Sequence, residues 1–277
     1  MNSSLSITQP SQAVSGLAFE VNRRRTFAII SHPDAGKTTL TEKLLLYSGA
    51  IEQAGSARAR QNQRSATSDW MALERERGIS ITSTVLQFAH GDRVFNLLDT
   101  PGHQDFSEDT YRTLMAVDSA IMVLDIAKGI EPQTRRLFEV CRSRNIPILT
   151  FINKLDMPGK EPLAIIDEID RTLNITAIPF NWPVGTGSFF QGTYDFAQRT
   201  VTRFQRHARG SLRAPSSITT LDDPALSESL GAYNWGQLHE EIELLLTDQR
   251  DFDRERFIHG AAARTNSAGF RGPEWSP

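Results

Sequence analysis

Apolar runs alternate with amphipathic, helix-spaced segments along the chain up to about residue 174. A run of consecutive apolar residues predicts a strand buried on both faces, whereas apolar residues three or four positions apart predict one face of a helix. Alternation of the two patterns indicates an α/β fold with a doubly wound, mostly parallel sheet. The strands that we expect occupy residues 26–30, 85–88, 94–98, 120–124 and 146–152, and the helices occupy residues 40–47, 106–117, 135–144 and 163–173.

The pattern changes at about residue 175, where Gly, Pro and aromatic residues divide the chain into short segments. These segments predict short strands and turns, then a loop over residues 208–224 and an amphipathic helix over 238–246. The start of the chain is Ser/Gln-rich, and its end has no periodicity. The divisions that we expect are a flexible N-terminal extension (1–20), a main α/β domain (21–174), a small α+β insert (175–260) and an aberrant tail (261–277).

A polar loop that runs from Ser31 to Thr39 lies between the first predicted strand and the first predicted helix. Such a loop can present backbone N–H groups to phosphate oxygens, and the helix that follows adds its positive N-terminal end. Lys37 can reach the outer phosphates, and the Thr38 hydroxyl can ligate Mg²⁺. The usual pattern, G-x-x-x-x-G-K-[ST], has a Gly where this sequence has Ser31. A Gly-Lys-Thr that merely begins a helix therefore stays an alternative for this segment taken alone.

A second polar segment, Asp99 to His103, follows the strand expected at 94–98. A carboxylate at the end of a strand can hold Mg²⁺ through water, and Gly102 lets a backbone N–H approach a γ-phosphate. His103 is then placed to orient the attacking water. The alternatives are an ordinary Pro-Gly turn and a histidine that faces solvent at the start of a helix.

A third polar segment, Asn153 to Asp156, follows the strand expected at 146–152. The Asp156 carboxylate can accept hydrogen bonds from guanine N1–H and from the 2-amino group, a donor pair that adenine lacks. Asn153 would join this segment to the phosphate loop, and the Lys154 stem would cover the base. Because parallel strands end at the same edge of a sheet, we expect all three polar segments to lie together there.

A fourth segment, Arg77 to Thr82, ends a long polar stretch that begins at Ile51. A hydroxyl in this segment can complete the Mg²⁺ shell while γ-phosphate is present. The four segments in this order converge on hydrolysis of a guanine nucleotide. The expected nucleotide-binding residues are Ser31, His32, Pro33, Asp34, Ala35, Gly36, Lys37, Thr38, Thr39, Asp99, Thr100, Pro101, Gly102, His103, Asn153, Lys154, Leu155 and Asp156. The expected metal ligands are Thr38, Asp99 and a hydroxyl of the fourth segment, and the expected catalytic residue is His103.

Composition restricts the classes of protein to which the chain can belong. It has 277 residues, of which 39% are hydrophobic and 23% charged, and a net charge of −3. This balance argues against a nucleic-acid binder that relies on general basicity, and we expect no direct DNA binding. No apolar run approaches the ~20 residues of a membrane-spanning helix. The single cysteine, Cys141, suits a reducing cytoplasm and is expected to be a buried hydrophobe rather than a nucleophile.

The four segments resemble those of the translational GTPases. Within that superfamily, Ser31 to Thr39 and Asp105 to Thr113 are similar to the bacterial peptide chain release factor 3 family, in which Ser31 is normal. Within the insert, Trp182 to Gly185 and then Phe190 to Tyr194 are similar to the insert that this family shares with elongation factor G. The resemblance implies a P-loop GTPase fold over residues 21–174 that binds GTP or GDP with Mg²⁺. It also implies that His103 is catalytic, that the ribosome stimulates hydrolysis, and that the partners are the ribosome and codon-reading release factors. Ser80 stands where relatives carry the Mg²⁺-binding Thr, so Ser80 is the expected third metal ligand and Thr82 the fallback. We expect the protein to be a monomer.

The resemblance weakens after about residue 260. The family continues with another strand, a Gly-Ser-Ala motif on guanine O6 and a final helix, whereas this sequence offers only Ser267-Ala268 without an apolar strand before it. We therefore expect a truncated chain that lacks the final strand and helix. Two alternatives remain: an elongation-factor-G-like GTPase, against which the Ser-His-Pro-Asp loop argues, and a nucleotide-binding remnant without full activity.

Overall fold

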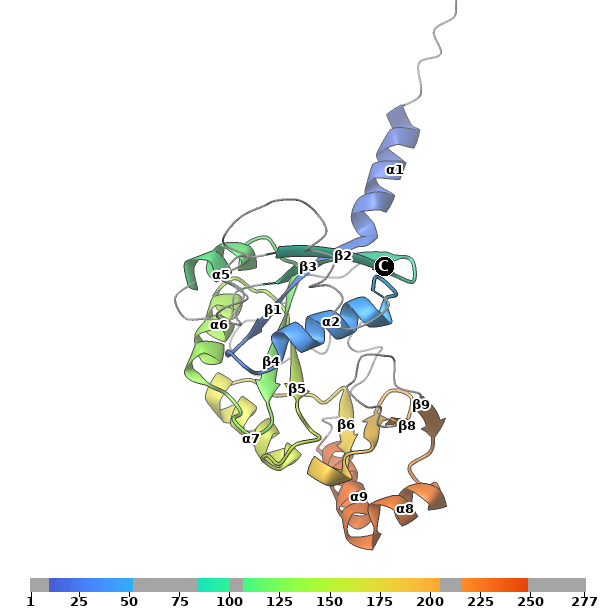
Figure 1. Cartoon of the computed structure of the whole chain (residues 1–277). Helices are drawn as coiled ribbons and strands as arrows, with labels where there is room; N and C mark the ends of the chain where they lie inside the picture. Colours follow the sequence, from blue (N-terminus) through green and yellow to red (C-terminus); the bar gives the residue numbers. More distant parts are fainter. Residues whose placement is uncertain (1–9, 52–83, 100–106, 205–215, 249–277) are drawn as a thin grey trace, which may run out of the picture.

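Five strands form the larger sheet of the protein, in the order β2-β3-β1-β4-β5 (Figure 1). The computed structural model describes residues 10–51, 84–99, 107–204 and 216–248. Within the sheet β1, β3, β4 and β5 are parallel, and β2 pairs with β3 in the antiparallel direction through the two-residue turn at Gly91 and Asp92. The strands are β1 (Arg24–Ser31), β2 (Thr84–His90), β3 (Arg93–Asp99), β4 (Ser119–Asp125) and β5 (Ile148–Asn153).

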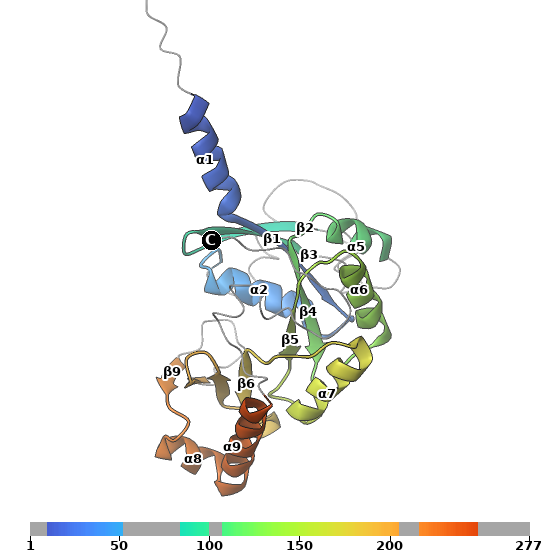
Figure 2. The same ribbon diagram turned by 180° about the vertical axis from the view of Figure 1, so that it is seen from behind.

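Helices cover both faces of this sheet (Figures 1 and 2). Because side chains alternate along a strand, Phe27 and Ile29 of β1 face one side while Ala28 and Ile30 face the other. Helix α2 packs on the Phe27 side, and three helices pack on the Ala28 side. The four helices are α2 (Lys37–Tyr47), α5 (Ser107–Leu114), α6 (Pro132–Ser143) and α7 (Pro162–Leu173).

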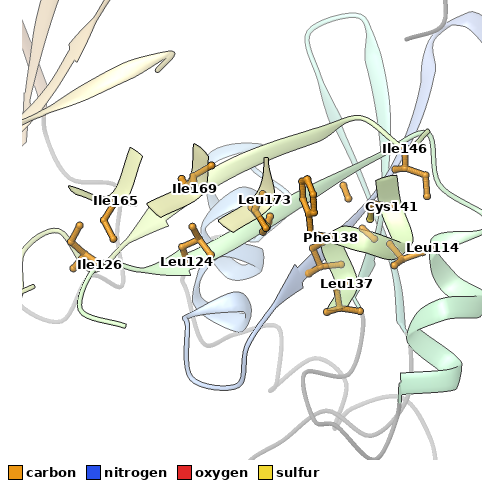
Figure 3. Close-up of a cluster of buried hydrophobic side chains, with 14 residues drawn as sticks. Leu114, Leu124, Ile126, Leu137, Phe138, Cys141, Ile146, Ile165, Ile169 and Leu173 are labelled. Carbon is orange, nitrogen blue, oxygen red and sulfur yellow. The ribbon is translucent and has the colours of Figure 1, made fainter. Parts of the chain in front are cut away.

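The larger hydrophobic core lies on the Ala28 side of the sheet (Figure 3). Leu124, Phe138 and Ile165 come from a strand and two different helices, and each is 4% exposed or less. Cys141 belongs to the same cluster and is fully buried. Burial raises the pKa of its thiol to about 11, which confirms the expectation that it packs as a small hydrophobe.

The smaller sheet lies in the insert, with strands in the antiparallel order β6-β7-β8-β9. Trp182, Tyr194 and Val201 point from its strands toward two helices, α8 and α9, and form a second core with them. The indole N–H of Trp182 donates to the carboxylate of Glu241 at 2.8 Å, which satisfies a buried polar pair between the sheet and α9. The elements are β6 (Asn181–Val184), η2 (Gly187–Phe189), β7 (Gly192–Asp195), β8 (Thr200–Phe204), β9 (Ser216–Thr219), α8 (Pro224–Leu230) and α9 (Ala232–Thr247).

Helix α7 joins the two cores. Ile165 and Ile169 lie in the larger core, whereas the neighbouring Ile166 lies in the insert core. The helix begins with Pro162 at its first position, where the missing N–H costs nothing, and ends at Asn174 in the left-handed conformation (φ 52°). Since one helix contributes to both clusters, we expect the insert and the main sheet to unfold together.

The α/β class, the mostly parallel sheet and the small α+β insert are as the sequence predicts. The expected loop over residues 208–224 is wrong in part, because residues 216–219 form β9 and Pro224 begins α8. Strand β9 is a short edge strand with Ile218 exposed, so no apolar pattern marks it. The expected absence of a final strand and helix, like the expected tail 261–277, concerns residues that lie outside those that the structure describes.

Residues Pro10–Asn22 form a helix, α1, where only a flexible extension was expected. The helix projects away from the sheet (Figure 1) and leaves Leu17 and Phe19 about two-thirds exposed. Glu20 pairs with Arg23 and Arg24 at its C-terminal end. Val14, Leu17 and Val21 lie at helical spacing, so the sequence contains an apolar period that the expectation of a flexible extension did not take into account. Among the described residues, no helix combines the length and the apolarity that crossing a membrane requires.

The larger core predicts a strong contrast between two aliphatic substitutions. Ile165→Ala should lower the free energy of unfolding by about 2–5 kcal/mol, because Ile165 is fully buried and its truncation leaves a cavity. Leu149→Ala, at a side chain on β5 that is 57% exposed, should cost less than about 1 kcal/mol. Urea denaturation followed by circular dichroism measures both values. Equal losses would contradict this assignment of the core.

Candidate functional site

The loop between β1 and α2 has the backbone of an anion-binding site. Ser31 ends β1 and Lys37 begins α2, so the loop itself comprises residues 32–36. Asp34 and Gly36 both have positive φ values, 67° and 100°. Alternation of left-handed with ordinary residues turns successive N–H groups toward one side, as in the backbone concavities that hold phosphate.

Buried polar atoms in and beside this loop support the same interpretation. Ser31 Oγ, His32 Nδ1 and Thr41 Oγ1 are buried and have no hydrogen-bond partner within the described part of the chain. A buried polar group needs a partner, and either a residue beyond the described part of the chain or a bound ligand can supply it. Lys37 is only 7% exposed, so its ammonium group lies within the site rather than in solvent. These residues therefore fit a bound anion.

The third polar segment is joined to this loop by a hydrogen bond. The Asn153 side-chain amide donates to the Ala35 carbonyl at 2.9 Å, although 118 positions separate the two residues. A Cβ atom on residue 36 would lie 2.1 Å from the same amide nitrogen. Gly36 is thus required twice, for its left-handed backbone and for the space that Asn153 fills.

A second contact joins the loop of residues 32–36 to the start of α6. His32 Nε2 lies 3.1 Å from Glu131 Oε1, and both side chains are mostly shielded from solvent. Glu131 immediately precedes α6 and belongs to none of the four sequence segments. Sequence reasoning missed it, since a glutamate before a helix that begins with proline is common and carries no spacing signal.

Lys154 is held by a carboxylate at the end of β4. It adopts a left-handed backbone (φ 63°), and its Nζ lies 2.8 Å from Oδ2 of Asp125, which is 5% exposed. Burial raises the pKa of Asp125, but hydrogen bonds from the Lys154 ammonium and the Ala127 N–H outweigh it and hold that pKa below its usual value. Asp125 therefore stays ionised near neutral pH and fixes the position of the lysine.

Asp156 stands free of this packing. Its side chain is exposed, while the preceding Leu155 packs against the larger core and accepts a hydrogen bond from the Gly187 N–H of the insert at 2.8 Å. The residue that precedes this solvent-facing carboxylate is thus anchored both to the larger core and to the insert. A carboxylate in this position is available to a ligand.

Three of the four predicted segments begin at the carboxyl edge of the larger sheet, as expected for parallel strands. In the register of the sheet Asp99 pairs with Ile29, two positions before Ser31, and Asn153 pairs with Asp125. The side chain of Asp99, the residues Thr100 to His103, and Ser80 with Thr82 lie outside what the structure describes. Pro33 is half-buried, and Thr38 and Thr39 lie in the first turn of α2. The roles of all these residues in binding remain predictions.

Comparison with known proteins agrees with this geometry. A family model described as the elongation factor Tu GTP binding domain matches residues 22–266. The protein named peptide chain release factor 3 in Gloeobacter violaceus is 61% identical over 244 residues, which are 88% of this chain and 46% of that relative. The protein of the same name in Synechocystis sp. is 56% identical over 263 residues, 94% of this chain and 48% of the relative. The chain thus spans about half the length of the curated relatives that it matches.

Among solved structures, a crystal structure of a protein from Thermus thermophilus is similar, with a TM-score of 0.63. The two sequences are 23% identical, and the match covers 90% of this chain and 36% of the other. At that level of identity the likeness shows the fold alone.

The contact between Gly36 and Asn153 predicts a difference between two glycine substitutions. Gly36→Ala should lower the free energy of unfolding by about 2–4 kcal/mol, because it combines left-handed strain with displacement of Asn153. Gly49→Ala shares a positive φ (78°) but meets nothing within 4 Å, so it should cost only the strain, about 1–2 kcal/mol. Chemical denaturation of both variants measures the difference. If Gly49→Ala cost as much as Gly36→Ala, Asn153 would not be held as described.

Proposed function

Since the chain belongs to the family of the elongation factor Tu GTP-binding domain, we propose that it binds GTP and GDP and hydrolyses GTP to GDP and phosphate. The observation that carries the proposal is the hydrogen bond from Asn153 to the Ala35 carbonyl. It joins a loop suited to phosphate to a loop whose exposed Asp156 suits guanine. A nucleotide that spans the two loops would use both.

In the proposed complex, the backbone of residues 31–36 and the Lys37 ammonium hold the phosphates. Thr38, Asp99 and either Ser80 or Thr82 would hold Mg²⁺, which neutralises charge on the phosphate oxygens when it is bound. The buried Ser31 hydroxyl and the low exposure of Lys37 support this assignment. Thr39 and the segment from Thr100 to Gly102 would complete the contacts to the phosphates.

Guanine is selected by Asp156 in this proposal. Its carboxylate accepts from N1–H and from the 2-amino group, while the aliphatic part of Lys154 covers the base and Leu155 anchors the loop. The ion pair between Lys154 and Asp125 supports the assignment, because it holds the lysine stem in one place beside Asp156.

His103 is proposed to orient the water that attacks the γ-phosphate. It follows Gly102, whose N–H would meet that phosphate, so the imidazole and the phosphate would lie close together. A positioned side chain of this kind typically contributes about 10²–10⁴-fold in rate. We propose that the ribosome stimulates the reaction, as the resemblance to translational GTPases implies.

The biological role that we propose is in termination of translation. The relatives at 56% and 61% identity are named peptide chain release factor 3, which favours this role over that of an elongation-factor-G-like GTPase. The chain would promote recycling of codon-reading release factors from the ribosome, as a monomer in the cytoplasm. Because it spans about half of those relatives, its partners and its activity are proposed for the GTP-binding part.

Base recognition is tested by Asp156→Asn. An amide cannot accept from both guanine donors, and a hydrogen bond to a charged group is worth about 1.5–3 kcal/mol, so GTP affinity should fall about ten- to a hundredfold. Xanthosine triphosphate, which offers an acceptor where guanine has the amino group, should gain affinity. Competition binding of the two nucleotides measures the shift.

The matched control is Asp167→Asn, an exposed aspartate on α7. It should leave the preference for GTP over xanthosine triphosphate unchanged. If Asp156→Asn also left that preference unchanged, the base-reading role would be refuted.

The catalytic role is tested by His103→Ala. The variant should keep its affinity for GTP and lose about 10²–10⁴-fold of its ribosome-stimulated turnover, because the histidine acts on water rather than on the nucleotide. His90→Ala, at the exposed end of β2, serves as the control and should change neither quantity. Equal loss of binding and turnover in His103→Ala would mean that the residue has a structural role.

A further inference from the structure

The loop between β4 and α6 touches both halves of the proposed nucleotide site without belonging to either. Its first anchor, Asp125, ends β4 and pairs with Lys154 at 2.8 Å. Its last residue, Glu131, precedes α6 and pairs with His32 at 3.1 Å. One seven-residue segment thus has a carboxylate at each end. One carboxylate pairs with the loop proposed to bind guanine, and the other pairs with the loop proposed to bind phosphate.

We propose that Asp125 and Glu131 are positioning residues at the two ends of one rigid segment, 125–131. Asp125 fixes Lys154 and through it the guanine loop, residues 153–156. Glu131 fixes His32 and through it the phosphate loop, residues 31–36. The proposal rests on the proposed function, since it assumes that these two loops share a nucleotide. It assigns roles to two residues that no nucleotide-binding segment of the sequence contains.

The segment is held rigid by its own hydrogen bonds. The Ala127 N–H donates to Asp125 Oδ1 at 2.8 Å, and the Gly129 N–H donates to the Asp125 carbonyl at 2.8 Å. The Ile130 N–H donates to Glu168 Oε1 at 2.9 Å, and Glu168 is itself paired with Lys160 at 2.6 Å. The N–H groups of three residues in the segment, 127, 129 and 130, are thus fixed by hydrogen bonds, so displacement of one end is resisted along the whole segment.

The guanine loop is aligned with this segment on its other side. The Ile126 N–H donates to the Asn153 carbonyl, and the Lys160 N–H donates to the Ile126 carbonyl, both at 3.1 Å. Lys154 lies between these two bonds with a left-handed backbone, which costs a non-glycine residue about 1–2 kcal/mol. The charge of Asp125 offsets that cost, because a buried carboxylate strongly favours an ion-paired partner.

The phosphate loop depends on the other end. His32 has one ring nitrogen paired with Glu131 and the other buried without a partner among the described residues. The Glu131 contact therefore determines how the ring is oriented beneath the loop. The Glu131 carbonyl also accepts the Arg135 N–H at 3.1 Å, which ties this orientation to the first turn of α6.

The two ends predict two different effects on binding, and the intact 277-residue chain is the material in which to measure them. Asp125→Asn removes the charge but keeps the acceptor for Ala127, so it should loosen Lys154 and the guanine loop. Its preference for GTP over inosine triphosphate, which lacks the 2-amino group, should fall about three- to tenfold. The phosphorus resonances of bound GDP should not move.

Glu131→Gln should give the reverse result. The preference for GTP over inosine triphosphate should stay as in the wild type, while the β-phosphate resonance of bound GDP should shift in the phosphorus NMR spectrum. Glu139→Gln, an exposed glutamate on α6, is the matched control and should change neither quantity. A variant that merely destabilised the fold would change both the nucleotide preference and the phosphorus spectrum. A positioning role predicts a change in one of the two quantities only.

A double variant tests whether Asp125 acts through Lys154. In a Lys154→Met background there is no ammonium to hold, so Asp125→Asn should change the nucleotide preference no further. If Asp125→Asn fails to fold, Glu131→Gln decides the proposal, since its side chain is partly exposed and lies at the end of a loop.

The outcomes separate this inference from the function on which it rests. Failure of the wild-type chain to bind GTP would overturn the proposed function and this inference with it. Normal binding, with the wild-type nucleotide preference in Asp125→Asn and the wild-type phosphorus spectrum in Glu131→Gln, would overturn the positioning roles alone.

Discussion

The hydrogen bond from the Asn153 amide to the Ala35 carbonyl is the constraint on which the site depends. It connects the loop after β5 to the loop after β1, two strands that are separated in the sheet by β4. The bond requires a residue without a side chain at position 36, because a Cβ atom there would lie 2.1 Å from the Asn153 amide nitrogen, and Gly36 meets that requirement. The chain itself thereby holds the two loops at one spacing, so the nucleotide binding that we propose need not supply the entropy of ordering them.

The sheet places these loops, and the two cores hold the sheet. Val123 and Met122 of β4 are both buried, one toward α2 and the other toward α6, so the central strands have no exposed face. The polar residues appear only where the strands end. Helix α7 connects the larger core to the insert core, because Ile165 packs in the first and Ile166 in the second. The Gly187 N–H of the insert donates a hydrogen bond to the Leu155 carbonyl. The loop after β5, residues 153–156, is therefore held by contacts with both the larger sheet domain and the insert.

Sequence patterns predicted the fold well where burial is continuous. The apolar runs of β1 and β4 and the spacing of the helices required no tertiary information, and the proximity of Asn153 to residues 31–36 followed from the parallel order of the strands. Strand β5 lies where its apolar run predicts, but the expectation that it is buried on both faces is wrong, because Leu149 and Phe151 are exposed on one face at the edge of the sheet. Edge strand β9 was missed because Ile218 is exposed and the segment is rich in serine. Asp125 and Glu131 were missed for another reason: a carboxylate at the end of a strand or at the start of a helix is common, and its partner is visible only in three dimensions.

In the proposed complex, one folded chain binds both the phosphates and the base of a guanine nucleotide. Calorimetric titration of the purified chain with GTP, GDP and ATP in the presence of Mg²⁺ tests this claim most directly. We predict that GTP and GDP bind with one site per chain, and that ATP binds at least about a hundredfold more weakly because its base lacks the donor pair for Asp156. Binding of ATP as tight as that of GTP, or a folded chain that binds none of the three, would contradict the account.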